Sequence, residues 1–142
     1  MTNDMSKKKL RYFIINKPYG MLSQFSPEHG KVCLANLDYK FPRDAYPVGR
    51  LDQDSEGLLV LTNDKSINHE LLAPEKKHSK TYLVQVEGTV TPEAIQQLET
   101  GVDIKAKGET HHTAPATIKI VEQPDWLLKR EPPVNEDKTT SW

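Results

Sequence analysis

Residues 49–64 read GRLDQDSEGLLVLTND, a stretch that carries three acidic side chains between two glycines and then enters an apolar segment. Gly49 and Gly57 permit backbone angles that a residue with a Cβ resists. Residues 58–61 can bury in a sheet and anchor the turn that precedes them. Because this layout holds a carboxylate in a fixed place, we expect the functional site of the protein to lie here.

Asp52 is the acidic residue that we expect to have a chemical role. Three carboxylates within five residues repel one another, so they cannot all be buried and ionised. Asp52 lies close to Arg50, whose guanidinium can pair with a carboxylate or a phosphate. Residues 54–56, in contrast, are typical of a polar turn or cap. One alternative stays open: the Asp52 side chain can serve only as a hydrogen-bond acceptor for the backbone of its own turn.

Two further blocks accompany this stretch. The first is NKPYG at residues 16–20, followed by LSQF at residues 22–25, and the second is KTYLVQVEG at residues 80–88. Taken in this order, the blocks resemble the pseudouridine synthases of the RsuA branch, which modify ribosomal RNA in bacteria, and most of all the E-type enzymes of the large subunit. The similarity runs from about residue 11 to residue 142, where Trp126 and the segments 132–133 and 140–142 fit the later part of the family pattern.

The resemblance implies a reaction and a set of roles. The reaction is isomerisation of a specific uridine to pseudouridine in ribosomal RNA, with the large subunit favoured and no cofactor. Asp52 is then the catalytic residue, as nucleophile, base or charge stabiliser at the ribose C1′. Arg50 occupies the space that the flipped uridine leaves, and the Tyr82 ring lies against the flipped base. Lys17 makes a phosphate or structural contact. Without the resemblance, the residue pattern favours a core aromatic on a strand for Tyr82, and Lys17 is equally an exposed loop lysine.

Composition is typical of a single globular domain. The chain has 142 residues, of which 36% are hydrophobic and 27% charged, which is enough to bury one core. We expect a soluble cytoplasmic monomer, because no apolar run approaches the ~18 residues of a membrane span and the N-terminus lacks a signal-peptide segment. Cys33 is the only cysteine, so an intramolecular disulfide is excluded and we expect a small buried side chain.

The charge is lower than expected for an RNA-binding protein. Nineteen basic and twenty acidic residues give a net charge of -1, whereas RNA-binding proteins usually carry a basic surface. Two local groups are basic: Lys7, Lys8, Lys9 and Arg11, and Lys76, Lys77, His78 and Lys80. Each is either an RNA contact or a solvated segment. The family continues after such a chain into a basic motif resembling Gly-Arg-x-x-Gln-x-Arg, so we expect a truncated chain that is inactive alone.

Sequence patterns predict an α+β fold, a mixed and mainly antiparallel sheet with helices packed on it. We expect strands at 11–15, 58–62, 81–86 and 114–121, a turn at 18–20 and a helical turn at 34–37. Helices are expected after a cap at Asn63 or Asp64, ending before Pro74, and from Thr91 to Gly101. Residues 131–140 are expected to form a loop. The predicted domains are a disordered polar tail over 1–10 and part of a catalytic domain over 11–142.

The histidines do not indicate a metal site. They lack the paired spacing of metal ligands, so we expect no metal site at His29, His69, His78, His111 and His112. His111 and His112 are adjacent and would point to opposite sides of a strand. A non-catalytic RNA-binding module and a nucleoside or glycoside hydrolase stay as alternatives, because both can use a basic surface or an aspartate beside a sugar.

Overall fold

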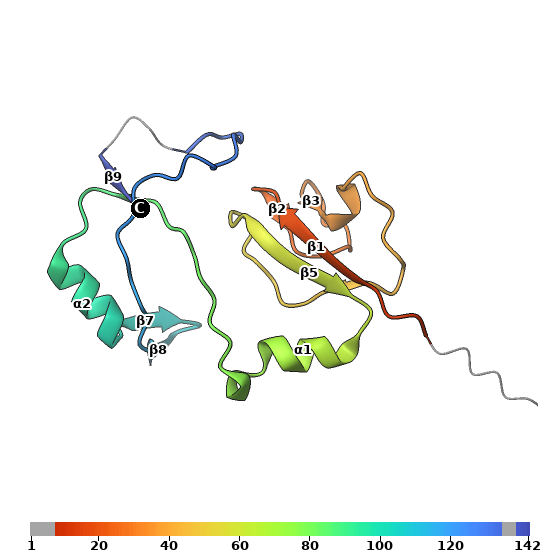
Figure 1. Ribbon diagram of the computed structural model, residues 1–142, viewed down its shortest axis with the longest axis horizontal. Coiled ribbons are helices and arrows are strands. Elements are labelled where there is room, and N and C mark those ends of the chain that lie inside the picture. Colours follow the sequence, from red (N-terminus) through yellow and green to blue (C-terminus); the bar gives the residue numbers. More distant parts are fainter. Residues whose placement is uncertain (1–7, 135–138) are drawn as a thin grey trace, which may run out of the picture. The chain divides into compact units, whose positions relative to one another are not determined.

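The computed structural model describes residues 8–134 and 139–142. Within it the chain forms two compact units, Met1–Lys80 and Thr81–Trp142 (Figure 1). Three sequence-based predictions fall partly outside the described residues: Lys7 of the first basic group, most of the tail over 1–10, and the middle of the loop over 131–140. Each unit is described below by itself.

A three-stranded antiparallel sheet organises the first unit. It has the order β1-β5-β4, formed by Tyr12–Lys17, Gly57–Thr62 and Tyr46–Pro47. β1 and β5 pair along their whole length, from Tyr12 opposite Thr62 to Lys17 opposite Gly57. The strands predicted over 11–15 and 58–62 are therefore confirmed, with ends shifted by one or two residues.

Smaller elements complete the first unit beside this sheet. β2 (Met21–Leu22) pairs in parallel with β3 (Val32–Cys33), and a 3₁₀ turn, η1, follows at Leu34–Asn36. This short turn confirms the helical turn predicted near residues 34–37. The turn predicted after β1 is also present, because residues 19 and 20 form it.

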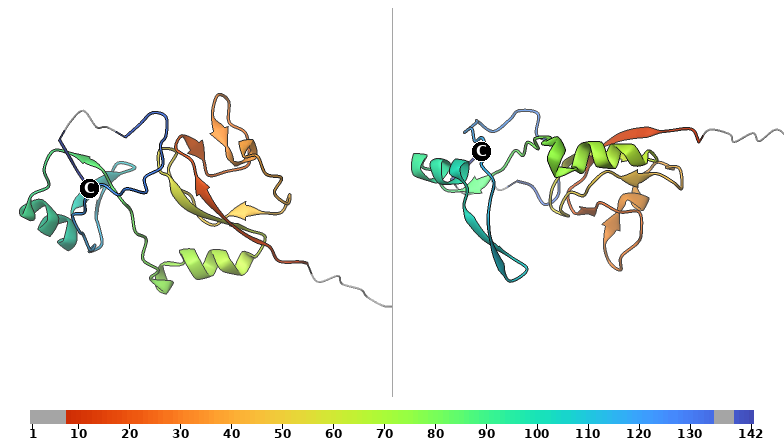
Figure 2. Two further views of the ribbon diagram at one scale, coloured as in Figure 1. Left: turned by 45° about the horizontal axis from the view of Figure 1, so that its top comes forward. Right: turned by 90° about the horizontal axis from the view of Figure 1, so that it is seen from below.

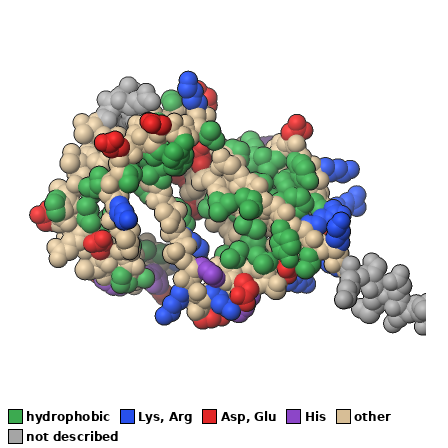
Figure 3. Space-filling model, viewed as in Figure 1, with side chains coloured by type: hydrophobic (Ala, Val, Ile, Leu, Met, Phe, Trp, Pro, Cys, Tyr) green, Lys and Arg blue, Asp and Glu red, His purple; other side chains and the backbone are tan. Residues whose placement is uncertain are grey.

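Side chains alternate between the two faces of the β1–β5 pair, as strand geometry requires. One face builds the core, where Met21, Leu34, Leu59 and Leu61 are buried. Cys33 is 2% exposed, which confirms its expected role as a small buried side chain. The other face is apolar and open: Ile14 is 73% and Leu58 69% exposed, and hydrophobic side chains gather over β1 and β5 in Figure 3.

Helix α1 (Lys65–Leu72) follows β5 directly. The Asp64 side chain accepts a hydrogen bond from the backbone N–H of Ser66, which makes Asp64 the N-cap. The helix ends at Ala73, before Pro74 opens a second 3₁₀ turn, η2 (Pro74–Lys76). Of the two caps that we predicted, Asp64 is thus the correct one, and the predicted end before Pro74 is confirmed.

The second unit contains one helix and two short strand pairs. β6 (Val86–Glu87) pairs with β9 (Thr140–Ser141), and β7 (Asp103–Ala106) forms a hairpin with β8 (Glu109–His112), seen in profile in Figure 2. Helix α2 covers Pro92–Thr100 with Thr91 as N-cap and Gly101 as C-cap. This helix matches the prediction at both ends. Across both units, none of the described helices has the length and apolar content to cross a membrane.

Of the two strands predicted in the second unit, one is much shorter than expected and the other is absent. Of residues 81–86 only Val86 lies in a strand, and residues 114–121 form none. Their apolar alternation suits a strand, but a strand also needs a hydrogen-bonded neighbour, and among the described residues β9 pairs only with Val86 and Glu87. The β7–β8 hairpin was not predicted. Its turn is Lys107-Gly108, where both residues have positive φ, the geometry of a tight hairpin turn. The α+β class itself is confirmed.

Candidate active site

The loop that carries Asp52 leads into β5, at the end of the sheet where β1 ends. Lys17 and Gly57 are paired at this end of the sheet, and the loop over 51–56 precedes Gly57. Asp52 is exposed, whereas Leu51 just before it packs against the hydrophobic core. The apolar strand thus anchors the acidic turn, as the sequence predicts, and the structure places Asp52 at the surface.

Ser23 fixes the loop on the N-terminal side of Asp52. Its hydroxyl accepts from the backbone N–H of Leu51 at 3.1 Å and donates to the Leu51 carbonyl at 3.0 Å. Ser23 is only 2% exposed. A hydroxyl can donate and accept at once, so one buried side chain satisfies both backbone groups of the residue before Asp52.

Gln53 fixes the loop on the C-terminal side. Its carbonyl accepts from the backbone N–H of Gly20 at 2.8 Å and from Lys17 Nζ at 3.2 Å. Its side-chain amide donates to the Gly20 carbonyl at 3.0 Å. Since Leu51 and Gln53 are both tied to the segment that follows β1, the backbone of Asp52 is held from both sides.

Lys17 is fully buried, with no exposed surface. Its ammonium donates to the carbonyls of Met21 at 2.7 Å, Pro18 at 3.0 Å and Gln53 at 3.2 Å. Burial lowers the pKa of Lys17, and the neighbouring carboxylates of Asp54, Glu56 and Asp52 act in the opposite direction. An ammonium has three N–H donors, and this one uses them all on protein carbonyls. Of the phosphate and structural contacts expected for Lys17, the geometry favours the structural one.

Arg50 and Asp52 do not pair with each other. The Arg50 guanidinium donates to Gln24 Oε1 at 2.9 Å on the exposed surface. No described residue forms a hydrogen bond or ion pair with the Asp52 carboxylate; the Asp52 carbonyl instead accepts from the N–H of Ser55 at 3.1 Å. In this arrangement the carboxylate is not the acceptor of its own turn, and both charged groups face solvent.

The glycines that bracket the loop have the predicted conformations. Gly49 has φ of 76° and Gly57 has φ of 117°, values that residues with a Cβ rarely adopt. A Cβ added at Gly49 would also approach Leu72 Cδ2 to 3.1 Å. The direction in which the chain enters and leaves the loop therefore depends on these two residues.

Tyr82 belongs to the second unit and is 63% exposed. It lies in the segment before β6 that has no strand partner among the described residues. The residue pattern alone favoured a core aromatic, and an exposure of 63% does not fit a side chain in a core. Its phenol ring is available to a partner outside the chain.

The histidines form contacts that are unrelated to the Asp52 loop. His112 Nδ1 lies 2.7 Å from Asp103 Oδ1 across the β7–β8 hairpin, and both side chains are exposed. In the part of the chain that the structure describes, no group of three His, Cys, Asp or Glu side chains is arranged to hold a metal ion.

Sequence reasoning missed Ser23 and Gln53 as residues that fix the loop. Ser23 lies within the block at 22–25 and Gln53 directly follows Asp52, so both were visible but carried no assigned role. Their partners are backbone groups, which a sequence does not identify. The position of Ser23 directly after the apolar residues 21 and 22 was the one available signal.

Comparison with known sequences gives the same family for most of the chain. The profile of the family described as "RNA pseudouridylate synthase" matches residues 11–139. A protein of Vibrio vulnificus named "Ribosomal large subunit pseudouridine synthase E" is 43% identical over 137 residues, covering 93% of this chain and 56% of the relative. A protein of the same name from Xanthomonas axonopodis pv. citri is 43% identical over 126 residues, covering 89% of this chain and 64% of the relative.

More distant relatives carry similar names. "Ribosomal large subunit pseudouridine synthase B" of Bacillus subtilis is 36% identical over 110 residues, covering 78% of this chain and 43% of the relative. A solved structure titled "Crystal structure of pseudouridylate synthase" aligns with a TM-score of 0.61 at 24% identity, over 80% of this chain and 48% of the other, which is a likeness of fold. The chain spans about half to two thirds of the length of the E-type relatives.

Proposed function

Because this chain belongs to the RNA pseudouridylate synthase family, we propose that its protein isomerises a uridine to pseudouridine in RNA. Ribosomal RNA of the large subunit is the substrate that the names of the relatives favour. The observation that carries the proposal is the Asp52 carboxylate, exposed and without a hydrogen-bond partner among the described residues, on a loop that Ser23, Gly20 and Lys17 hold from both sides.

The reaction exchanges one bond to the ribose for another. The bond between C1′ and N1 of the base breaks, the base turns, and a bond forms between C1′ and C5. The proton on C5 leaves and N1 takes up a proton, so the product is an isomer and no co-reactant is consumed. Cleaving the first bond develops positive charge at the sugar, as in glycoside hydrolysis.

Asp52 acts on this developing charge. A carboxylate can stabilise the charge, form a covalent adduct at C1′ or remove a ribose proton. Each route requires a carboxylate whose lone pairs are available and whose position is fixed before the substrate arrives. Asp52 meets the first requirement because it is exposed and its carboxylate has no hydrogen-bond partner among the described residues, and the contacts of Leu51 and Gln53 meet the second.

Arg50 and Tyr82 assist by binding the RNA around the target. A base inside a stacked helix is out of reach, so the uridine must be flipped outward at a cost of a few kcal/mol. Arg50 is exposed, and the one acceptor for its guanidinium among the described residues is the neutral side chain of Gln24. Its side chain can therefore leave Gln24 and fill the space that the flipped base leaves. Tyr82 exposes its ring and can stack on the flipped base.

The proposal is tested by purifying the protein together with any sequence that its gene encodes beyond these 142 residues, incubating it with a large-subunit ribosomal RNA transcript and separating the nucleosides after digestion. Pseudouridine should appear with the wild-type protein and not with Asp52→Asn, while both proteins bind the RNA equally. Asp54→Asn is the matched control, because it removes the same charge two residues away. Activity that survives Asp52→Asn would refute the role of Asp52, and release of free uracil would show a hydrolase instead.

A further inference from the structure

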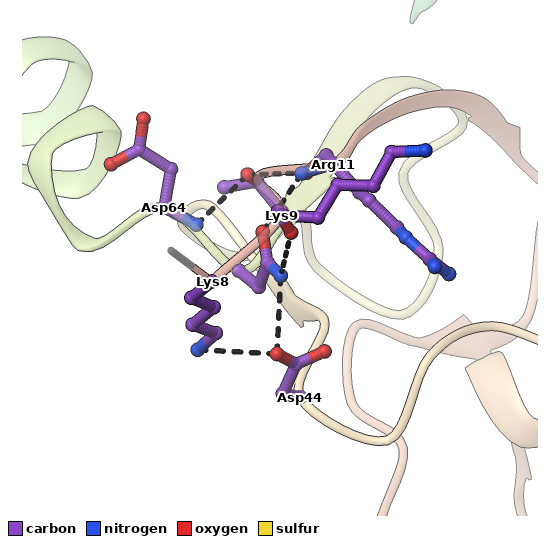
Figure 4. A network of polar contacts seen from close by, with 7 residues as sticks. Lys8, Lys9, Arg11, Asp44 and Asp64 are labelled. Carbon is purple, nitrogen blue, oxygen red and sulfur yellow. Dashed lines mark hydrogen bonds and ion pairs between the residues drawn. The ribbon is translucent and has the colours of Figure 1, made fainter. Parts of the chain in front are cut away.

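The segment before β1 is attached to the first unit by a chain of polar contacts, shown in Figure 4. Its centre is Asn63, which is 5% exposed. Asn63 Oδ1 accepts from the N–H of Arg11 at 2.9 Å, and Asn63 Nδ2 donates to the Lys9 carbonyl at 3.0 Å. The Arg11 carbonyl accepts from Thr62 Oγ1 at 2.7 Å. The backbone of the described residues 9–11 is therefore held in place rather than free in solvent.

The nearby carboxylates are occupied within this network. Asp44 accepts from Asn63 at 3.1 Å and pairs with Lys8 at 3.1 Å. Asp64 accepts from the Tyr12 hydroxyl at 2.6 Å and caps α1 through Ser66. These contacts lower the pKa of both carboxyl groups. Both acids keep their charge, but their oxygens are committed to partners of the protein.

The cationic groups of the same region are not occupied. Lys9 and Arg11 extend away from the network to the same side in Figure 4, and both residues are exposed, as is Arg43 beside Asp44. No described residue forms a hydrogen bond or ion pair with these three cationic groups. We call Lys9, Arg11 and Arg43 the basic edge. It lies at the end of β1 opposite the Asp52 loop, about 20 Å away at ~3.3 Å per strand residue.

We propose that the basic edge binds phosphates of the RNA substrate, several nucleotides away from the target uridine. This inference rests on the proposed function, which makes RNA the partner. With a net charge of -1, the chain as a whole does not attract a polyanion, so attraction must come from a local excess of cations. The basic edge supplies this excess on a backbone that is already ordered, which reduces the entropy lost on binding.

The salt dependence of RNA binding tests the proposal. The probe is a fluorescent 24-nucleotide RNA hairpin with uridines in its loop, titrated with the protein by anisotropy at 20–150 mM KCl. For the binding constant K, log K falls as log salt concentration rises. In the Lys9→Gln/Arg11→Gln double variant this negative slope should become shallower by about 1.4 to 1.8, since each lost phosphate contact removes ~0.7 to 0.9 from its magnitude. The control Lys105→Gln/Lys119→Gln removes the same charge from exposed lysines of the second unit and should change the slope by less than half as much.

Equal slopes for the two double variants, or no RNA binding by the wild-type protein at 20 mM KCl, would overturn the proposal. Folding is not expected to change, because Lys9 and Arg11 contact the network through backbone atoms; urea midpoints check this. Binding is measured without turnover. A protein that binds through the basic edge but forms no pseudouridine would therefore refute the proposed function and not this inference.

Discussion

Replacing Lys17 with methionine removes a buried side chain that joins the end of β1 to the Asp52 loop. Methionine has a similar length and suits a buried site, but it offers no donor to the carbonyls of Met21, Pro18 and Gln53. Hydrogen bonds from a charged donor contribute ~1.5 to 3 kcal/mol each, and relief of the desolvated ammonium offsets part of the loss. We expect the free energy of unfolding to fall by about 3 kcal/mol.

Cys33 provides the assay for this change. It is the only cysteine and is 2% exposed in the first unit, so its reaction with a thiol reagent reports unfolding of that unit. With a urea slope of ~2 kcal/mol per M, the midpoint for Cys33 labelling should fall by about 1.5 M. The control Lys31→Met removes an exposed lysine paired with Glu28 and should cost less than ~1 kcal/mol. A Lys17→Met midpoint no lower than that of the control would refute this account of Lys17.

Three further predictions concern the same unit. Ser23→Ala should destabilise it by about 1 to 2 kcal/mol, because Leu51 loses a buried donor and acceptor; an unchanged Cys33-labelling midpoint would contradict this. Gly57→Ala should lower the free energy of unfolding by about 1 to 3 kcal/mol through backbone strain at φ of 117°, and an unchanged or raised urea midpoint would contradict this. Below the ordinary pKa of 3.8, stability should fall with pH, because the folded state keeps Asp44 and Asp64 ionised to lower pH than the unfolded chain does. In Asp64→Asn the urea midpoint should depend less on pH between 4 and 2.5, and an equal dependence would exclude Asp64 as a contributor.

Local signals in the sequence predicted the parts of the fold that local chemistry decides. Asp64 and Thr91 cap helices through their own side chains, and both caps lie next to recognisable apolar patterns. Gly49 and Gly57 have the conformations that their positions suggested. The attachment of the acidic turn to an apolar strand was likewise predicted, because residues 58–61 are apolar and follow the turn directly.

Contacts between distant segments could not be predicted in this way. Ser23 reaches Leu51 across 28 positions and Lys17 reaches Gln53 across 36, and in both cases the partner is a backbone group with no sequence signature. The β7–β8 hairpin was missed for a related reason. β7 alternates polar and apolar side chains over only four residues, and all four residues of β8 are polar, so no longer apolar pattern marks the pair as strands.

The central claim is that the Asp52 carboxylate carries out isomerisation of a uridine in ribosomal RNA. The most direct measurement is pseudouridine mapping of ribosomal RNA from cells whose own gene carries Asp52→Asn, compared with cells that carry Asp54→Asn and contain equal amounts of the protein. The account predicts that a large-subunit pseudouridine disappears with Asp52→Asn and persists with Asp54→Asn. An unchanged set of pseudouridines in the Asp52→Asn cells would contradict it.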